Sequence, residues 1–254
     1  MPVASILIPV FNREELVQRA IQSALAQTLS DIEVIVVDNA STDSTWEVVR
    51  RLAGTDPRIR AYRNETNLGP VRNWQRCVQY AQTPFSKILF SDDLIAVNYL
   101  ERTIPALFDS NCGLAYVPCT VGYAEWVGGT HYRAFANDCN FLRDSFVRAA
   151  TLLEHFTPVS PGAAVFRTDD LRKNILTSLP SVSGYDFSAT GAGVDWLIYL
   201  LTALAYPYVK YVCDPLVFFR AHEGSISVGS KTRDSVPEGY TLAKKWLRAN
   251  VGGL

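Results

Sequence analysis

Strand-like and helix-like patterns alternate over the first 93 residues of the chain. The strand-like runs occupy residues 5–10, 32–37, 58–63 and 88–90, and most of them are nearly continuous in apolar residues, as in strands buried on both faces. Between the first two runs, apolar residues stand at positions 16, 17, 20, 21, 24 and 25, the spacing of an amphipathic helix. The order β-α-β-α-β-α-β predicts an α/β fold with a Rossmann-like, doubly wound, mostly parallel sheet.

Polar residues before the predicted helices suggest where each helix starts. Asn12 stands three residues before Glu15, a variant of the capping box, and Ser44 stands three residues before Glu47. Pro70 suits the first turn of a helix, because its missing N–H has no intrahelical partner there.

The second half of the chain is less regular. We expect helices over residues 99–108, 143–156 and 194–205, strands at 114–118, 162–167, 208–212 and 216–220, and a basic helix at the C-terminal end. Residues 119–142 are rich in glycine, tyrosine and tryptophan, which suits either hairpins or a loop. We expect long loops at 180–193 and 222–233.

Composition and charge narrow the functional class. The chain has 254 residues, 48% of them apolar, and a net charge of -1, so a large core is available and no basic field argues for nucleic acid. Five cysteines without a C-x-x-C pair favour a reduced setting and make zinc unlikely. The start has no signal-peptide pattern, and the longest mostly apolar stretch, 196–209, is too short to span a bilayer. We therefore expect a cytoplasmic protein.

Two adjacent carboxylates, Asp92 and Asp93, follow the fourth apolar run after a single serine. Buried carboxylates are costly without a positive partner, and a hard divalent cation shared with substrate phosphates would supply one. The pair therefore suggests a metal-diphosphate site at the carboxyl end of a strand, where open α/β sheets bind ligands. The alternative is that one aspartate simply caps the following helix, and for an isolated pair that interpretation is favoured.

Other polar residues also stand where the predicted strands end. They are Asn12, Asp38, Asn64 and Asn67. Neither G-x-G-x-x-G nor G-x-x-x-x-G-K-[ST] occurs, so a dinucleotide cofactor and a P-loop are not supported.

Several blocks of the chain closely resemble family 2 glycosyltransferases. The resemblance is strong over residues 4–95 and returns twice later. The blocks are SILIPVFNR at 5–13, SALAQT at 23–28, VIVVDNASTDST at 34–45, NLGPVRN at 67–73, FSDDL at 90–94, GVDW at 193–196 and FRAHEGSIS at 219–227. Their number and order make the resemblance far more specific than any one motif.

The resemblance implies a GT-A fold in one domain over residues 1–254, with a nucleotide-sugar-binding half at 1–95, an acceptor and catalytic half at 96–232, and a C-terminal helix at 233–254. It implies inverting transfer of a hexosyl group from a UDP- or dTDP-linked donor to a glycan or lipid-linked saccharide, in bacterial surface polysaccharide synthesis, with Mn²⁺ or Mg²⁺ on the diphosphate. The implied roles are the base-binding residues Pro9, Phe11 and Asn12, Asp38 for the pyrimidine N3–H, Arg72 for the base or ribose, Asp92 for the ribose or metal, Asp93 for the metal, and Asp195 as general base.

Three positions keep alternatives open. Phe90 stands where many relatives carry the first aspartate of an Asp-x-Asp-Asp motif, so one carboxylate is missing. His222 suits a metal ligand, a hydrogen-bond donor to the diphosphate, or an ordinary loop residue. Two roles are open for Asp195: a base that takes the acceptor's proton, or a residue that caps its helix.

Two rival functions and one further contact follow from the same residues. A sugar nucleotidyltransferase would need a glycine-rich loop after the first strand, where this chain has Phe11, Asn12 and Arg13. A catalytically silent nucleotide-sugar or glycan binding module is disfavoured by the intact aspartates. The stretch 244–248 (KKWLR) suits peripheral contact with an anionic membrane, although a solvated helix face is the commoner reason for such a sequence.

Overall fold

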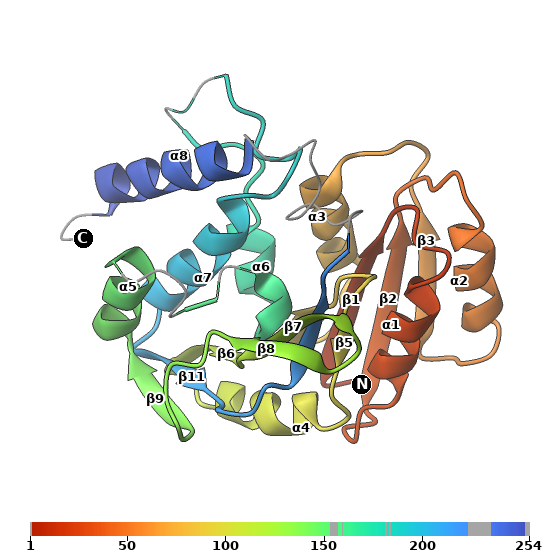
Figure 1. The fold of residues 1–254 in the computed structure, drawn as a ribbon, viewed down its shortest axis with the longest axis horizontal. Coiled ribbons are helices and arrows are strands. Elements are labelled where there is room, and N and C mark those ends of the chain that lie inside the picture. The colour runs from red at the N-terminus through yellow and green to blue at the C-terminus, as the bar shows by residue number, and fades with distance from the viewer. Residues whose placement is uncertain are drawn as a thin grey trace.

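A computed structural model describes residues 2–152, 157–158, 160–180, 182, 184–222 and 235–251. Figure 1 shows a sheet with helices on both sides and α8 across one end. The strands are β1 (Ala4–Val10), β2 (Ile32–Asp38), β3 (Ile59–Arg63), β4 (Phe85–Ile88), β5 (Leu94–Ile95), β6 (Cys112–Tyr116), β7 (Cys119–Ala124), β8 (Val127–His131), β9 (Cys139–Leu142), β10 (Ala164–Arg167), β11 (Tyr208–Tyr211) and β12 (Val217–Arg220). The helices are α1 (Val17–Leu25), α2 (Thr45–Ala53), α3 (Pro70–Tyr80), α4 (Tyr99–Thr103), α5 (Arg143–Leu152), α6 (Thr168–Asn174), α7 (Val194–Leu204) and α8 (Ser235–Asn250), with 3₁₀ turns at Ile104–Phe108 and Pro161–Ala163.

The main sheet has the strand order β3-β2-β1-β4-β10-β6-β11-β9. Strands β3, β2, β1 and β4 are mutually parallel, as the alternating sequence pattern predicts. Strand β10 is antiparallel to β4 and β6, and the edge strand β9 is antiparallel to β11. The prediction of a doubly wound, mostly parallel α/β sheet is therefore confirmed.

Side chains alternate between the two faces of this sheet, and each face has its own core. Ile6 and Ile8 belong to a cluster with residues of α1, α2 and α4, whereas Leu7 belongs to a cluster with residues of α3, α5, α6 and α7. Because successive side chains of a strand point to opposite faces, a nearly continuous apolar run is needed when helices cover both.

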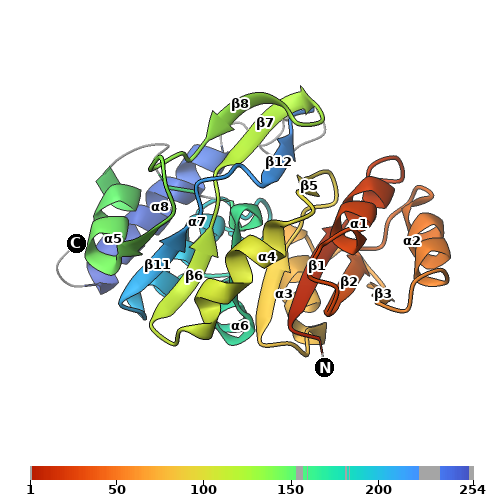
Figure 2. The ribbon, with the colours of Figure 1, turned by 90° about the horizontal axis from the view of Figure 1, so that it is seen from below.

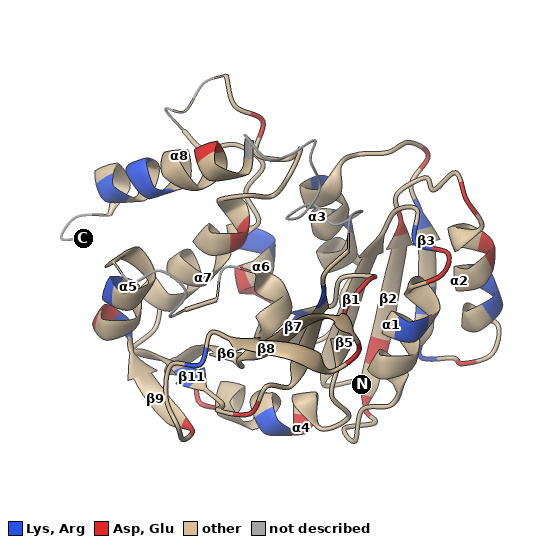
Figure 3. Cartoon of the chain, viewed as in Figure 1, with Lys and Arg blue, Asp and Glu red and all other residues tan. Residues whose placement is uncertain are grey.

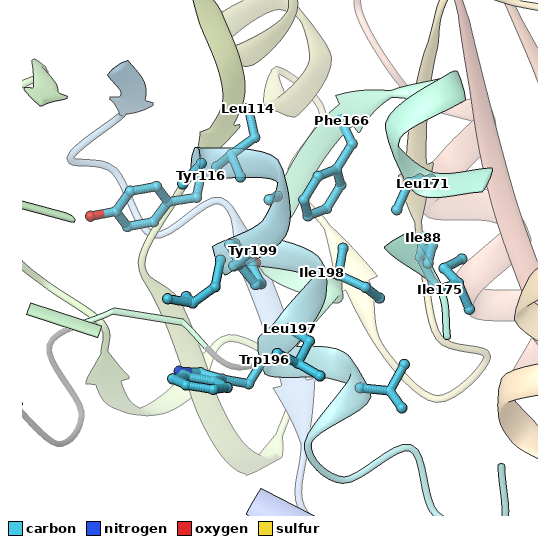
Figure 4. Packing of buried hydrophobic residues seen from close by; sticks show 14 of the residues in the cluster. Ile88, Leu114, Tyr116, Phe166, Leu171, Ile175, Trp196, Leu197, Ile198 and Tyr199 are labelled. Carbon is cyan, nitrogen blue, oxygen red and sulfur yellow. The ribbon is translucent and has the colours of Figure 1, made fainter. Parts of the chain in front are cut away.

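Helix α7 forms the centre of the second half. Figure 4 shows its side chains packed against Leu114, Tyr116 and Phe166 of the sheet on one side and Ile175 on another. Five consecutive residues of α7, from Trp196 to Leu200, are buried. A helix that is apolar on all sides must be covered on all sides, so neighbouring helices have to enclose α7.

A smaller sheet with the order β5-β12-β7-β8 lies beside the main one. Figure 2 shows β7, β8 and β12 side by side at one border of the molecule. Of the two alternatives for residues 119–142, the structure has a hairpin of β7 and β8 followed by edge strand β9.

Two of the predicted helix starts differ from the structure. Asn12 does not cap α1, because α1 begins at Val17 and Asn12 adopts a left-handed backbone conformation with φ of 50°. Ser44 precedes α2 as expected but makes no side-chain cap, and the Thr45 N–H instead donates to Asp43 at 3.0 Å. Pro70 lies in the first turn of α3, as predicted.

Buried asparagines hold together the loops that follow β2 and β3. The Asn64 side-chain amide donates to Asn39 and to Asn73, at 2.9 Å each. Asn73 on α3 donates to the carbonyl of Val37 at 3.0 Å, and the Leu68 N–H donates to Asn39 at 2.9 Å. Because these amides are buried and mutually satisfied, they fix the carboxyl ends of the strands relative to α3.

We expect Asn73→Ala to lower the free energy of unfolding by about 2 kcal/mol, because it leaves the buried Asn64 amide without one of its acceptors. Urea unfolding of the full chain measures this. The matched control is Gln79→Ala on the exposed side of the same helix, which should change stability by less than about 0.5 kcal/mol. Equal effects of the two substitutions would contradict the role of the asparagine cluster.

Candidate functional site

The loops after β1, β2 and β4 meet at the carboxyl edge of the main sheet, since these three strands are parallel neighbours. Asn12 and Thr42, which follow β1 and β2, are joined by the Thr42 N–H donating to Asn12 Oδ1 at 2.9 Å. Arg13 then reaches the loop after β4, where its Nε lies 3.5 Å from Asp92 Oδ2. Polar residues that the sequence placed at separate strand ends therefore lie at one edge.

Asp38 is fully buried at the end of β2. Its Oδ2 lies 3.0 Å from Nε of Arg63, and its Oδ1 accepts a hydrogen bond from the Ser41 hydroxyl. The Arg63 side chain is 40% exposed and lies over the ring of Trp46 at 5.7 Å. Arg63 thus occupies Oδ2 of Asp38, and a ligand that binds this oxygen would compete with the guanidinium.

Pro9, Phe11 and Arg72, the other residues predicted for the base and ribose, lie in different environments. Pro9 is buried in β1, in register with Val37 of β2, whereas the Phe11 ring is 39% exposed directly after β1. Arg72 on α3 donates to the Ser188 hydroxyl at 2.8 Å. Phe11 therefore offers an exposed ring at the edge of the sheet, and Arg72 links α3 to the segment before α7.

Asp92 is surrounded by positively charged or polar groups. Nε2 of His222 lies 2.9 Å from Oδ2 of Asp92, close to the contact of the same oxygen with Arg13. Helix α4 begins only at Tyr99, so neither Asp92 nor Asp93 caps it. The alternative of a simple helix cap is wrong.

Asp93 is buried beside Asp92, and both its burial and that neighbouring charge raise its pKa well above the ordinary value. The Arg220 N–H donates to Asp93 Oδ1 at 3.0 Å and opposes this rise. The charge of Lys87, which lies inside β4, also lowers the pKa of Asp93. Its Nζ donates to the Gly162 carbonyl and lies 4.8 Å from the centre of the Tyr99 ring, and burial lowers its pKa to about 7.

The tip of the β7–β8 hairpin holds the side chain of Arg220. Glu125 Oε1 accepts from Nη2 of Arg220 at 2.7 Å and from Nη1 of Arg19 on α1 at 2.5 Å. Arg220 also donates through its N–H to Asp93 and through Nε to the Asp92 carbonyl, so the small sheet is joined both to α1 and to the acidic loop, residues 89–93. Figure 3 shows acidic and basic residues intermingled over the described part of the chain, in keeping with the near-zero net charge.

Within the described residues, no group of three His, Cys, Asp or Glu side chains is arranged to hold a metal ion alone. Mg²⁺ and similar hard cations typically take one or two carboxylates and complete their shell with water and substrate phosphates. Asp92 and Asp93 offer two carboxylates in the loop after β4, and the His222 imidazole, which follows β12, contacts Asp92, but the three are not arranged to hold a metal ion without further ligands.

Phe90 takes a structural role in place of the missing carboxylate. Its ring packs 5.4 Å from that of Trp74 on α3. A Cβ at Gly191 would come within 2.4 Å of the Trp74 ring, so the segment before α7 also packs against this tryptophan. Because Asp195 donates its N–H to the Gly191 carbonyl at 3.0 Å, Trp74 connects the acidic loop to the start of α7.

Asp195 lies partly buried in the first turn of α7. Its Oδ1 accepts from the N–H groups of Gly193 and Trp196, at 2.9 and 2.7 Å, and its Oδ2 accepts from the Tyr240 hydroxyl at 2.6 Å. Burial raises the pKa of Asp195 to about 7, although all three hydrogen bonds lower it. The N-cap of α7 is Gly193, so Asp195 is not the capping residue itself, although its carboxylate binds two N–H groups at the helix start. A carboxyl with a pKa of about 7 is also suited to proton transfer.

Sequence reasoning missed several residues of this site. Arg63, Lys87, Glu125 and Tyr240 were not singled out, and Arg13 and Arg220 were noted only as members of motifs. Lys87 had one visible signal, a charge inside an otherwise buried strand. For the other three, the contact joins residues far apart in the chain and no local pattern marks it. The residues 223–227 of the last resembling block lie outside the described part.

Several known proteins are similar to this chain in sequence. A family model described as glycosyl transferase family 2 matches residues 5–175. An uncharacterized glycosyltransferase of Haemophilus influenzae is 35% identical over 104 residues, which is 41% of this chain and 42% of that protein. The GalNAc(5)-diNAcBac-PP-undecaprenol beta-1,3-glucosyltransferase of Campylobacter jejuni is 37% identical over 118 residues, 46% of this chain and 37% of the relative. The chain thus spans less than half the length of these relatives.

Solved structures share the fold at low sequence identity. The crystal structure of S. aureus TarS 1-349 in complex with UDP has a TM-score of 0.68 and 18% identity, covering 95% of this chain and 65% of that one. The mannosyltransferase PcManGT of Pyrobaculum calidifontis, in complex with GDP-Man and Mn²⁺, has a TM-score of 0.58 and 19% identity, covering 88% and 58%. Among the described helices of this chain, none is long and apolar enough to cross a membrane.

We expect Asp93→Asn to raise the thermal midpoint at pH 8 by about 3 °C, the shift that about 1 kcal/mol causes in a domain of this size. Asparagine keeps an acceptor for the Arg220 N–H but removes the charge that burial and Asp92 disfavour. Since the folded-state pKa is raised, the wild-type chain loses stability as pH rises above the unfolded value, so the difference should shrink toward pH 4.

Thermal unfolding with a chelator present, at pH 4 to 8, measures this difference. Asp31→Asn, at an exposed aspartate, is the control and should be nearly neutral throughout. A variant at position 93 that is less stable than wild type at pH 8 would contradict the account of the acidic pair.

Proposed function

Because the chain belongs to glycosyltransferase family 2, we propose that it transfers a hexosyl group from a nucleotide-sugar to a hydroxyl of a glycan or lipid-linked saccharide, with inversion at the anomeric carbon. One observation carries the proposal. The edge that binds ligands in open α/β sheets holds Asp38 and the Asp92–Asp93 pair, and Trp74 joins it to the segment that presents Asp195.

For the donor we propose UDP or dTDP as the nucleotide. A pyrimidine with an N3–H can donate to Asp38 once Arg63 has moved off the carboxylate, and Phe11 can contact the base through its exposed ring. Asn12 and Arg72 would complete the base and ribose site with Pro9 beneath. The UDP in the TarS complex and the UDP-Glc donor in the name of the Escherichia coli relative WfgD support this choice of donor class.

We propose that the diphosphate lies beside Asp93, Asp92 and His222, which would share a Mn²⁺ or Mg²⁺ ion with the phosphate oxygens. When bound, such a cation stabilises the negative charge of the leaving nucleoside diphosphate as a Lewis acid. The Mn²⁺ in the PcManGT complex supports a divalent cation in this fold. The chain's own residues also contribute, since Arg13, Arg220 and His222 place positive or donor groups around the acidic loop.

Asp195 is the proposed general base. A bond forms between the acceptor oxygen and the anomeric carbon as the bond from that carbon to the phosphate oxygen breaks, and the acceptor's hydroxyl proton passes to Asp195. The nucleoside diphosphate leaves with the electron pair of the broken bond. A carboxyl whose pKa is raised to about 7 is ionised enough at neutral pH to accept the proton and basic enough to pull it.

Support for the acceptor comes from the names of the relatives. The relatives of Campylobacter jejuni and Escherichia coli are named as beta-1,3-glucosyltransferases with undecaprenol diphosphate-linked acceptors, which supports a lipid-linked saccharide as acceptor. We propose bacterial surface polysaccharide synthesis on the cytoplasmic side of the membrane as the setting. In α8, Leu247 is fully buried, whereas Lys245 and Arg248 are exposed. Peripheral contact with an anionic membrane would therefore use these two charges rather than the apolar side of the helix.

We expect Asp195→Asn to lower turnover by about 10²–10⁴-fold and to leave donor binding nearly unchanged, because the substitution removes the base without touching the nucleotide site. Turnover is followed as UDP released from a panel of UDP-sugars with a saccharide acceptor mixture, and binding by calorimetry. The matched control is Asp170→Asn, at another partly buried aspartate that accepts from a tyrosine, 2.9 Å from Tyr206.

The control should keep wild-type turnover. If donor binding fell as much as turnover in Asp195→Asn, the assignment of the base would be wrong. If wild type bound UDP-sugars but never turned over any of them, the silent binding module would be favoured instead.

A further inference from the structure

Helix α8 packs closely against the start of α7. A Cβ placed at Gly193 would lie 2.5 Å from the carbonyl oxygen of Gly239 and 2.9 Å from Cβ of Ala243, so only glycine fits there. Gly193 also has a φ of 89°, a conformation that side chains other than glycine rarely adopt. Ala243 and Leu247 of α8 are fully buried. The two helices therefore pack directly against each other, and Figure 1 shows α8 lying across the end of α7.

This contact brings the Tyr240 hydroxyl to Asp195, the candidate base. Tyr240 of α8 donates to Asp195 Oδ2 at 2.6 Å, within the short range of hydrogen bonds to a charged oxygen. The other oxygen, Oδ1, is held by the N–H groups of Gly193 and Trp196. The carboxyl group is thus fixed from both sides, and Oδ2 keeps a second lone pair for a substrate hydroxyl.

We propose that Tyr240 is a positioning residue for glycosyl transfer: it orients the Asp195 carboxylate and stabilises its ionised form, which makes α8 part of the catalytic half. This inference rests on the proposed function, because it assumes that Asp195 acts as the base. Both residues lie beyond residue 175, where the match to the family model ends.

The electrostatic surroundings give Tyr240 a specific effect. Burial raises the pKa of Asp195, and the Tyr240 hydrogen bond is the largest of the contributions that lower it. The other titratable groups close to this pair are Tyr185 and Glu238, with Tyr132 near Tyr240. Among the described residues that act on this pair, none of these groups is a cation, and it is hydrogen bonds that favour the ionised carboxylate.

The test uses the full chain and needs no identified acceptor. Aspartate carboxyls are labelled with ¹³C, and the Asp195 signal is assigned by its loss in Asp195→Asn. We expect the Asp195 titration midpoint, about 7 in wild type, to rise by about one pH unit in Tyr240→Phe, since one hydrogen bond to a charged group is worth about that much. The rate of UDP release from UDP-sugars should fall, and the acidic limb of its pH profile should move to higher pH by the same amount.

Tyr206→Phe is the matched control, because it removes the same type of hydrogen bond from Asp170 on α6. It should leave the Asp195 midpoint and the pH profile unchanged. An unchanged midpoint in Tyr240→Phe, with Asp195→Asn inactive, would overturn the role of Tyr240 and leave the proposed function standing. Faster turnover in Tyr240→Phe would overturn it as well, because the tyrosine would then compete with the acceptor hydroxyl.

Full turnover in Asp195→Asn would instead overturn the proposed base and, with it, any catalytic role for Tyr240. The titration and the turnover therefore separate a failure of this inference from a failure of the proposed function.

Discussion

Two like charges at the end of a buried strand are the constraint to which the surrounding structure responds. Asp92 and Asp93 are neighbours, and Asp93 is buried. Such a pair is unstable without nearby donors and positive charge. Three groups supply these: Arg13 in the loop after β1, the N–H of Arg220 in β12, and Lys87 within β4. A divalent cation bound at the same loop would relieve the remaining repulsion, which is in keeping with the proposed diphosphate site.

The same contacts tie together segments that are far apart in the chain. Glu125 holds Arg220 and so connects the β7–β8 hairpin to the acidic loop, while Trp74 packs on both Phe90 and Gly191. In this arrangement a donor bound over Asp38 and the acidic pair would lie in one packed unit with the start of α7, where Asp195 would meet the acceptor.

The first half of the fold was predictable from the sequence, and the second half only in part. Nearly continuous apolar runs specify β1 and β2 because parallel strands must be apolar on both faces. Helix α7 was equally clear, since a run such as Trp196–Leu200 has no polar face. The fourth strand was placed too late, since β4 is Phe85–Ile88 and contains Ser86 and Lys87, whereas the apolar run lies at 88–90. The role of Asn12 was not predictable, because a capping pattern does not reveal that the backbone turns left-handed to reach Thr42. Nor was the pairing of Asp38 with Arg63 or of Asp195 with Tyr240, since each depends on how separate elements pack.

The most direct test of the account is calorimetric titration of UDP into the wild-type chain and Asp93→Asn, each with and without Mn²⁺, with CDP as a second ligand. The account predicts that UDP binds wild type only with Mn²⁺, that Asp93→Asn loses this binding while staying folded, and that CDP binds more weakly because its N3 presents a lone pair to Asp38 rather than an N–H. Equal binding of UDP and CDP, without metal and in both proteins, would contradict it.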